Sequence, residues 1–292
     1  MIEGFFTAIG SPIVNMFRML NSFGVFILFQ LRVFPLLFTT LSRLQLLLKQ
    51  IELIGIGTIG VVTLTALFTG MVEAIQLYNG FHDFGVESFM GYTIFVSITK
   101  ELGPVFATLM LISRAVSAMA AELGTMRVTE QIDAIETLGI DSKKYLIVPR
   151  IVATTISLPM LVAAFDFVAI SSAYFISTTV LDVNPISYQD TIMRLGEFSD
   201  IGTGLIKAAV FGFIVSSIGT YIGYHTHGGA RGVGLETIIW RVYYAVAMFV
   251  ANYILDSFLR VIGWLTFKQD MVPCYVIPIC WVDLSGSRQM GP

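Results

Sequence analysis

Three ionisable residues, Lys100, Glu101 and Arg114, lie within one long apolar stretch of the sequence. The stretch covers residues 89–119 and is otherwise long and apolar enough to cross a lipid bilayer. A charged side chain in such a segment costs about 3 kcal/mol on insertion scales, so by default it marks a functional site. Because neighbouring residues on a helix point about 100° apart, Lys100 and Glu101 cannot both face lipid.

The Lys100–Glu101 pair allows two interpretations, which the sequence leaves open. The two residues can be an interfacial pair that reaches the outer headgroups, since they lie near the outer end of the stretch. They can equally line a central cavity that meets the headgroup of an amphiphile. Gly103-Pro104 follows, and a proline leaves the carbonyl one turn earlier without its donor and permits a kink. Lys207 matches Lys100 in depth on a later apolar segment. Two such cations would suit a phosphate, but two lysines that reach out to the headgroups would show the same pattern.

Two further charged residues in apolar segments have simpler explanations. Arg114 lies near the inner end of its stretch, beside Ser113 and Ser117. An arginine that reaches lipid phosphate on the inner leaflet explains it better than a catalytic role. Asp166 lies nearer the middle of a later apolar segment and needs a partner or water, and a structural ion pair is the favoured interpretation.

The sequence lacks the motifs that would make it an enzyme of a familiar class. It contains no G-x-x-x-x-G-K-[ST], no H-E-x-x-H and no G-x-S-x-G. The glycine-rich patterns at 55–60 and 228–234 fail as nucleotide motifs, because one lies inside a span and no strand precedes the other. Cys274 and Cys280 have no histidine nearby and predict neither a disulfide framework nor a zinc site. We therefore expect no catalytic residue, metal or cofactor in this chain, and no binding to nucleic acid.

The composition places the chain in a membrane. Apolar residues make up 55% of it and charged residues 13%, whereas soluble domains carry about 25% charged residues. The mean hydropathy is +0.80. The N-terminus contains Glu3 and no basic region, so it does not predict a signal peptide.

The apolar runs predict an all-α polytopic protein with five transmembrane helices. The third run is too long for an upright helix, so we expect it to be tilted or to extend beyond the bilayer. Residues 182–200 between the third and fourth runs are predicted to be a polar loop. The five spans are predicted over residues 53–77, 89–119, 147–180, 201–224 and 237–265.

Three regions follow from this pattern. Residues 1–50 are predicted to form amphipathic helices that lie in the membrane interface, because basic residues interrupt their apolar runs. A sixth span over 20–42 is the alternative. Residues 51–265 form the transmembrane domain, and 266–292 form a tail of unknown role.

The distribution of Lys and Arg predicts the orientation. The loops at 78–88 and 181–200 hold only Arg194. The positive-inside rule therefore places the N-terminus, the segment after the second span and the 225–234 loop in the cytoplasm, and five spans leave the tail on the far side. The basic residues on the cytoplasmic side are Arg18, Arg32, Arg43, Lys49, Arg127, Lys143, Lys144, Arg150, Arg231 and Arg241.

The cytoplasmic segment 122–139 is predicted to be a polar helix. It mixes acidic residues with Met126, Ile132, Ile135 and Leu138, as a surface helix with one apolar face does. It joins two spans directly and has no domain of its own to pack on. A cytosolic partner or the membrane surface must therefore cover the apolar face.

Four stretches of sequence resemble the MlaE/YrbE family of permeases. They are KELGPV at 100–105, SRAVSAMAAELGTMRVTEQIDAIETLGID at 113–141, VPR at 148–150 and GYHTHGGARGVG at 223–234, and the resemblance covers roughly residues 20–262. Members are membrane subunits of ABC-type lipid transporters that work with MCE-domain proteins in Gram-negative envelopes and chloroplasts.

The resemblance implies a permease subunit rather than an enzyme, in the bacterial inner membrane. It implies a homodimer that binds phospholipid at its centre, exchanges it with a periplasmic MCE-domain protein and helps to maintain outer-membrane lipid asymmetry. A separate cytosolic ABC ATPase would use the ATP, and a small STAS-like accessory subunit is a further candidate partner. The implied lipid-binding residues are Lys100, Glu101 and Lys207. The implied ATPase-coupling residues are Glu122, Gly124, Met126, Arg127, Glu130, Asp133, Glu136 and Gly139.

Two features depart from the family pattern. Asn252 stands where relatives often have an acidic residue, which puts a carboxylate role there in doubt, and the segment after Gly263 extends beyond the usual family end. Two other function classes are alternatives. A self-contained secondary transporter or channel would be marked by inverted repeats, and the sequence has no convincing internal repeat. A membrane scaffold that docks a cytosolic protein would give Lys100 and Lys207 no role.

Overall fold

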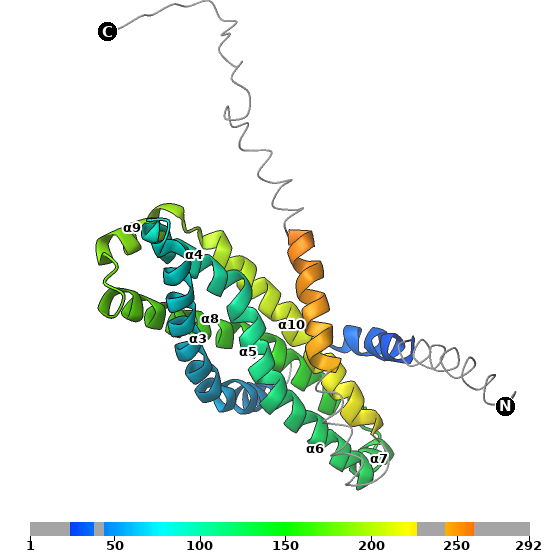
Figure 1. Ribbon diagram of the computed structural model, residues 1–292. Coiled ribbons are helices and arrows are strands. Elements are labelled where there is room, and N and C mark those ends of the chain that lie inside the picture. The colour runs from blue at the N-terminus through cyan, green and yellow to red at the C-terminus, as the bar shows by residue number, and fades with distance from the viewer. Residues whose placement is uncertain (1–23, 38–43, 227–242, 260–292) are drawn as a thin grey trace, which may run out of the picture. The chain divides into compact units, whose positions relative to one another are not determined.

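The computed structural model describes residues 24–37, 44–226 and 243–259, and every regular element in these ranges is helical (Figure 1). The predicted all-α class is therefore confirmed. The chain divides into two compact units, Met1–Asn252 and Tyr253–Pro292, and the first contains the elements that follow. Besides helix Gly24–Leu37 they are α2 (Leu44–Ile51), η2 (Glu52–Ile56), α3 (Gly57–His82), η3 (Glu87–Phe89), α4 (Met90–Ser97), η4 (Ile98–Leu102), α5 (Gly103–Leu111), η5 (Ile112–Val116), α6 (Ser117–Val128), α7 (Gln131–Thr137), η6 (Lys143–Ile147), α8 (Val148–Thr179), α9 (Pro185–Leu195) and α10 (Phe198–His225).

Four continuous helical segments are long and apolar enough to cross a membrane, and they confirm the first four predicted spans. They extend over Leu44–His82, Glu87–Val128, Lys143–Thr179 and Phe198–His225. The fifth predicted span is represented by the shorter apolar helix Tyr243–Leu259, since its predicted start and end lie outside the described residues. The tail at 266–292, with both cysteines, and most of the 225–234 loop also lie outside them.

Four five-residue turns of π-helix, none of them predicted from the sequence, occur in these segments: η2, η4 and η5 lie inside spans, and η6 begins the third one. A π turn inserts one residue into the helix, changes the direction of the side chains that follow, and is frequent at functional sites. The turn η4 contains Lys100 and Glu101, and η5 contains Arg114. The three charged residues within the predicted second span, residues 89–119, thus lie at its two irregular turns.

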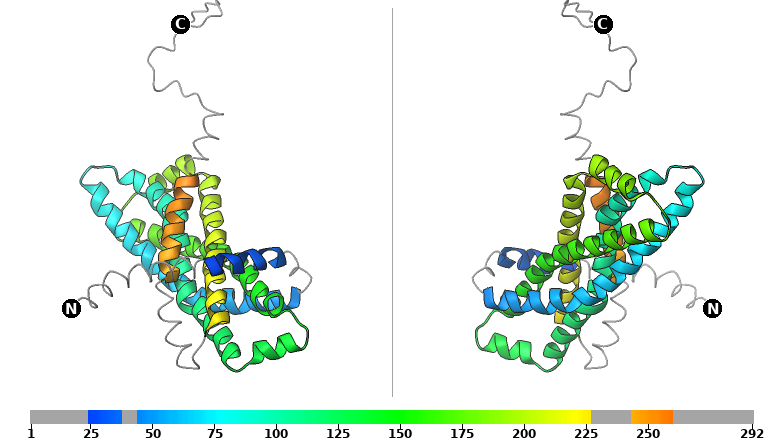
Figure 2. Two further views of the ribbon diagram at one scale, coloured as in Figure 1. Left: turned by 90° about the vertical axis from the view of Figure 1, so that its right-hand side faces the viewer. Right: turned by 90° about the vertical axis from the view of Figure 1, so that its left-hand side faces the viewer.

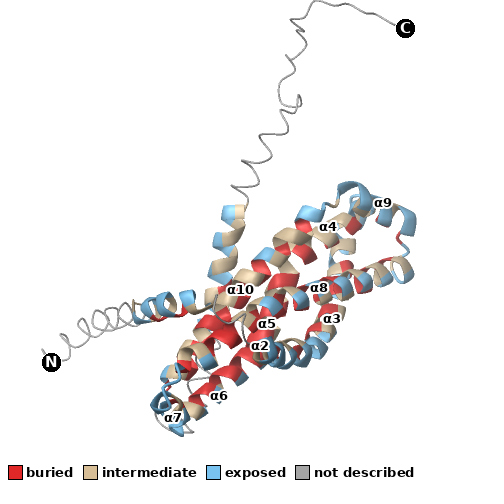
Figure 3. Ribbon diagram, turned by 180° about the vertical axis from the view of Figure 1, so that it is seen from behind, coloured by how far each residue is buried: buried red, intermediate tan, exposed pale blue. Residues whose placement is uncertain are grey.

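Helix α8 packs against both α3 and α10, and α10 also packs against α6. Buried residues, red in Figure 3, lie along these helices. Glycines permit the closest approaches. A Cβ atom added to Gly70 of α3 would lie 2.1 Å from the carbonyl oxygen of Ala169 in α8. A Cβ atom on Gly212 of α10 would lie 3.0 Å from the carbonyl oxygen of Thr154. Small residues that bring helix backbones into contact are the usual means of packing in membranes. The long α8 runs obliquely to α10 (Figure 2), as expected of a helix too long to stand upright.

The described N-terminal helix, Gly24–Leu37, runs crosswise to α10 (Figure 2). Its buried residues Phe29 and Val33 form one apolar cluster with Ile147, Val148 and Ile151 at the start of α8. The ring of Phe29 also meets that of Tyr221, near the end of α10, with centroids 5.3 Å apart. The start of α8 and the end of α10 are on the predicted cytoplasmic side. The interfacial helix and the alternative span at 20–42 both stay predictions.

The predicted polar loop at 182–200 is wrong in its middle, which forms the helix α9. The side chain of Asn184 caps this helix by accepting hydrogen bonds from the backbone N–H groups of Ile186 at 2.9 Å and Ser187 at 3.4 Å. Pro185 occupies the first turn, where its missing N–H costs nothing. Tyr188 is buried against Gly91 of α4. Asn-Pro was therefore a helix-start signal that the overall polarity of the segment obscured.

The predicted single helix at 122–139 is also wrong, because the chain breaks at Glu130. This residue has a left-handed backbone, with φ of 59°, and it separates α6 from α7. The break follows the β-branched pair Val128-Thr129, which supports a helix poorly. Gly139, with φ of 76°, ends α7 with hydrogen bonds from its own N–H to Glu136 and from the N–H of Ile140 to Ile135. The segment that is predicted to be cytoplasmic is therefore an elbow made of α6 from Glu122 onward, the short α7 and Gly139.

Candidate functional site

Two glycines allow α10 and α8 to approach the turn that carries Lys100 and Glu101. A Cβ atom on Gly204 of α10 would lie 2.0 Å from the carbonyl oxygen of Thr99, so the two backbones are in direct contact. A Cβ atom on Gly103 would lie 2.0 Å from a carboxylate oxygen of Asp166 in α8. Lys207 follows Gly204 by three residues and so lies on the same face of α10. The glycine thereby brings a lysine of one span against the charged turn of another.

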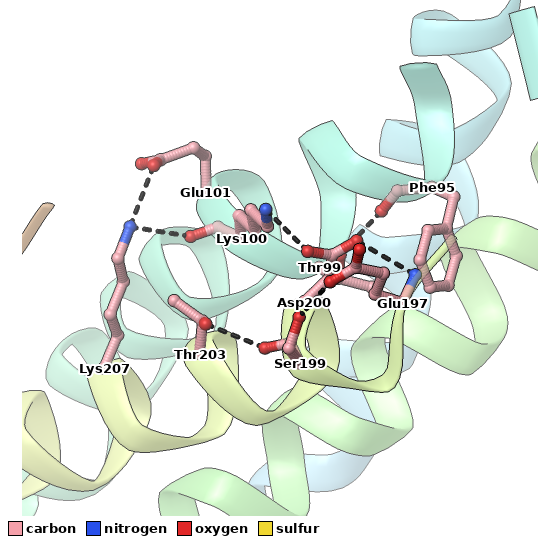
Figure 4. Close-up of polar contacts among 9 residues, drawn as sticks. All are labelled: Phe95, Thr99, Lys100, Glu101, Glu197, Ser199, Asp200, Thr203 and Lys207. Carbon is pink, nitrogen blue, oxygen red and sulfur yellow. Dashed lines mark hydrogen bonds and ion pairs between the residues drawn. The ribbon is translucent and has the colours of Figure 1, made fainter. Parts of the chain in front are cut away.

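Lys207 is completely buried and spans the gap between α10 and η4 (Figure 4). Its ammonium lies 2.8 Å from Oε1 of Glu101 and donates a hydrogen bond of 3.0 Å to the backbone carbonyl of Lys100. That carbonyl would normally accept from the N–H four residues later, which is Pro104 and has none. The lysine therefore satisfies both a buried carbonyl and a carboxylate.

Lys100 is paired with Asp200, which is not among the site residues predicted from the sequence. Its ammonium lies 2.6 Å from Oδ1 of Asp200 in the first turn of α10, and the Asp200 side chain is buried (Figure 4). The other oxygen of Asp200 accepts a hydrogen bond of 3.3 Å from the backbone N–H of Glu197, which completes a capping box. The E-x-x-D pattern at 197–200 was the available signal, since an acidic residue three positions after a helix cap is typical of a helix start.

Asn252 completes the cluster from helix Tyr243–Leu259. Its side-chain nitrogen donates a hydrogen bond of 3.1 Å to Oε2 of Glu101. Both oxygens of that carboxylate are therefore occupied, one by Lys207 and one by Asn252. An ionised acid at position 252 would repel Glu101, whereas an amide donates to it. The departure from the family pattern thus fits the carboxylate that it faces.

The predicted lipid-binding residues come together, but they differ in exposure. The side chain of Lys207 is 0% exposed, whereas those of Lys100 and Glu101 are 36% and 41% exposed. The cluster contains two lysines and two carboxylates in two ion pairs, so its charges balance. A ligand that approaches this chain would meet Lys100 and Glu101 first, with Lys207 behind them.

Asp166 differs from its prediction. The structural ion pair expected for it is not found among the described residues, and its Oδ1 is buried there without a hydrogen-bond partner. The side chain lies against Gly103, one turn from the polar cluster. Within the same described ranges, no three His, Cys, Asp or Glu residues gather in a way that could hold a metal ion.

The residues predicted to couple to an ATPase all lie on the α6–α7 elbow, but their environments differ. Glu122 is bound to the buried Arg150 of α8, with 3.0 Å between charged atoms. Arg127 and Asp133 pair across the elbow at 2.7 Å. The apolar face is covered in part, since Ile132 is fully buried while Leu138 is exposed. Of the remaining predicted residues Gly124 is buried, Met126 is half-buried, and Glu130, Glu136 and Gly139 are exposed.

Glu136 joins the elbow to the end of α10. Its Oε1 accepts hydrogen bonds of 2.5 Å from Ser142 and 3.0 Å from the hydroxyl of Tyr224. These two bonds, the one from Ser142 first, hold the pKa of Glu136 below its ordinary value. The guanidinium of Arg127 also lies 5.7 Å from the centre of the Tyr224 ring. The elbow is therefore tied to α10, the same helix that carries Lys207 and Asp200.

Comparison with known proteins finds one matching family and several similar proteins. The sequence model of a family described as Permease MlaE matches residues 47–258. The chain is similar to a probable ABC transporter permease protein of Rickettsia bellii, with 39% identity over 240 residues, which are 82% of this chain and 93% of that protein. It is 30% identical over 265 residues, 88% of this chain and 98% of the other, to the intermembrane phospholipid transport system permease protein MlaE of Haemophilus influenzae. It is also 37% identical over 211 residues to the chloroplastic protein TRIGALACTOSYLDIACYLGLYCEROL 1 of Arabidopsis thaliana, covering 72% of this chain and 60% of that protein.

Proposed function

Because the chain belongs to the MlaE permease family, we propose that it is the membrane subunit of a phospholipid transporter driven by a separate cytosolic ATPase. The relative from Haemophilus influenzae is named as part of an intermembrane phospholipid transport system. The multi-pass helical bundle is suited to the same task. The bacterial inner membrane, the homodimer and a role in outer-membrane lipid asymmetry are parts of this proposal.

The observation that carries the proposal is the polar cluster of Lys100, Glu101, Asp200, Lys207 and Asn252. Charged groups within membrane spans need partners or water, and here they gather at one place instead of scattering over the lipid-facing surface. Lys100 and Glu101 are partly exposed and bear opposite charges. They would contact the phosphate and the ammonium of a zwitterionic headgroup, respectively. Lys207 would hold Glu101 in position and supply further positive charge.

We propose that the ATPase binds at the α6–α7 elbow and acts through α10. The exposed acidic residues Glu130 and Asp133 and the exposed Leu138 offer it a surface. Glu136 contacts Tyr224, which is separated from Lys207 by 17 residues of continuous helix, or about 25 Å along its axis. A displacement of the elbow could therefore reach the polar cluster through one rigid element. In this proposal the partner subunit binds the ATP.

The remaining partners follow from the family. We propose that a periplasmic MCE-domain protein receives or delivers the lipid at the outer end of the bundle. A small STAS-like subunit is a further candidate on the cytosolic side. Purification in mild detergent after expression with the neighbouring genes, followed by mass spectrometry of bound subunits and lipids, tests these assignments together.

Transport by the reconstituted complex tests the polar cluster. Replacing both Lys100 and Lys207 with Leu should lower lipid co-purification and lipid transfer between vesicles while leaving ATPase binding intact. Arg194→Leu is the matched control, because this arginine is 75% exposed and lies outside the cluster. Since the double variant leaves Glu101 and Asp200 without their cations, Lys207→Met with Glu101→Gln is the charge-balanced companion. Normal lipid transfer by both variants would refute a lipid-binding role of the cluster.

A further inference from the structure

A second polar site lies at the opposite end of the second span, around Arg114. A groove of about 170 Å³ runs between two helical faces there. One face presents Gln50, Leu53 and Ile54, and the other presents Arg114, Ala115, Ala118, Met119 and Glu122. One bound water needs only about 15 Å³ by such a measure, so the groove can hold a small polar group.

The groove results from the pattern of side-chain sizes on the two faces. Arg114, Ala118 and Glu122 recur every four residues and so line one side of the continuous helix η5–α6. Ala115 and Ala118 are too small to fill the space between the helices. Leu53 at the edge of the groove is 62% exposed and Ile56 beyond it is 67% exposed, so an apolar surface continues outward from the groove.

The guanidinium of Arg114 has unused capacity for hydrogen bonds. It packs against the backbone of Gly57, where a Cβ atom would lie 2.5 Å from Nη1. The same Nη1 donates a hydrogen bond of 3.0 Å to the hydroxyl of Thr58. A guanidinium has five N–H donors. Among the described residues, the Thr58 hydroxyl is the one acceptor of a hydrogen bond from it. No carboxylate in the described ranges pairs with it.

The charges around the groove favour an anion next to Arg114. One residue that lines the groove, Glu122, is acidic. Its Oε2 lies 3.0 Å from Nη2 of the buried Arg150, so its charge is already balanced. Gln50 is neutral and can donate through its amide. The lining residues together with Arg150 therefore carry one net positive charge, and it lies at Arg114.

We propose that this groove binds the phosphate group of a phospholipid from the leaflet that the distribution of basic residues assigns to the cytoplasm. The guanidinium would donate to two phosphate oxygens, as arginine does in bidentate phosphate recognition. The groove is smaller than the roughly 300 Å³ of a typical ligand pocket, so it takes the headgroup alone. The acyl chains lie outside along Leu53 and Ile56. This site is separate from the cluster around Lys207, and its test does not depend on transport.

Photolabelling of the full-length protein in bilayer nanodiscs tests the proposal. The discs contain phosphatidylethanolamine and phosphatidylglycerol, with a trace of phospholipid that carries a photoreactive group next to the phosphate. Mass spectrometry of the digested protein should find label on residues 112–122. Arg114→Gln removes the guanidinium and its positive charge, and Ala118→Leu fills the groove while keeping the charge. Arg114→Gln should lower that label about tenfold, the usual effect of losing a charged hydrogen bond. Ala118→Leu should lower it as well, because the larger side chain excludes the headgroup from the groove.

Lys49→Gln is the matched control, since Lys49 is an exposed cation on α2 next to the groove but does not line it. Its label at 112–122 should equal that of the wild type. Unchanged label in both Arg114→Gln and Ala118→Leu would overturn the proposal. Equal labelling by a photoreactive diacylglycerol, which has no phosphate, would show a mere apolar crevice and overturn it too. Suppression of the label by excess inorganic phosphate would show a site for free phosphate instead of lipid.

Discussion

The ammonium of Lys207 donates a hydrogen bond of 3.0 Å to the backbone carbonyl of Lys100, the carbonyl that Pro104 leaves without its helical donor. An unsatisfied carbonyl inside a membrane bundle is costly, because no water is available to replace the missing bond. The same ammonium pairs with Glu101 in the same π turn. Lys207 therefore stabilises the irregular turn and also balances the charge of Glu101.

Lys207→Met should destabilise the protein, because it leaves a carbonyl unsatisfied and Glu101 without its cation. Removing one member of a buried pair costs about 3–5 kcal/mol, and the partial exposure of Glu101 should bring the loss to the lower end. Adding Glu101→Gln should restore part of the lost stability, because no unpaired charge then remains. Thermal unfolding of the single and double variants in detergent gives the coupling between the two sites. Strictly additive losses would show that the pair does not interact.

Gly204→Ala should force α10 away from η4, since the new Cβ atom would lie 2.0 Å from the Thr99 carbonyl oxygen. Overpacking of this kind costs about 1–3 kcal/mol, and here it would also separate Lys207 from Glu101. Gly202→Ala is the matched control on the same helix, because its Cβ atom would meet nothing within 4 Å. The control should be neutral or slightly stabilising, since alanine favours helix over glycine. Equal unfolding temperatures for the two variants would contradict the backbone contact.

Much of the fold could be predicted because apolar runs and basic loops act locally. The first four spans follow from lengths and charges that each segment carries by itself. Lys100, Glu101 and Lys207 could be selected because charge is rare in such segments. Asp200 could not be chosen as the partner of Lys100, since their pairing depends on the register between two helices 100 residues apart in the chain.

The irregular features were missed for the same reason. A π turn such as η4 has no composition of its own, and its geometry is set by what packs against it. The break at Glu130 is equally hidden, because a glutamate is not a residue that usually adopts a left-handed backbone. Asn184 followed by Pro185 is a local helix-start signal. The average polarity of residues 182–200 predicts a loop and masks that signal.

Asp200→Asn should weaken the contact between α10 and η4. The amide can still accept from the N–H of Glu197, but it no longer balances the charge of Lys100. Losing a charged hydrogen bond at this buried side chain should cost about 1–2 kcal/mol. Asp190→Asn is the control, since Asp190 and Arg194 form an exposed pair on α9, and such pairs contribute at most about 1 kcal/mol. If unfolding in detergent shows the same midpoint for both variants, the Lys100–Asp200 pair has no structural importance.

The contribution of Glu136 to stability should disappear in acid. Its pKa in the folded protein is lowered from the ordinary 4.5 by hydrogen bonds from Ser142 and Tyr224. The carboxylate therefore stabilises the fold fully above that ordinary value, and the contribution is lost as the pH falls through the lowered pKa. Glu136→Gln should melt earlier than the wild type at neutral pH, and the two melting curves should converge in acid. A difference in melting temperature that stays constant with pH would contradict this linkage.

The docking assignment for the elbow can be separated from its internal contacts. Glu130 is exposed, and among the described residues its side chain makes no hydrogen bond or ion pair, so Glu130→Lys reverses the surface charge without breaking a side-chain contact there. Asp133→Arg also breaks the pair with Arg127, and adding Arg127→Glu should restore that pair with its charges exchanged. If an ATPase binds here, Glu130→Lys and the exchanged pair should both release it during affinity purification, while the permease remains folded and membrane-bound. Loss only in the single variant Asp133→Arg would mean that the elbow needs its internal pair but is not the binding surface. Retention of the ATPase by every variant would place the binding surface elsewhere on the chain.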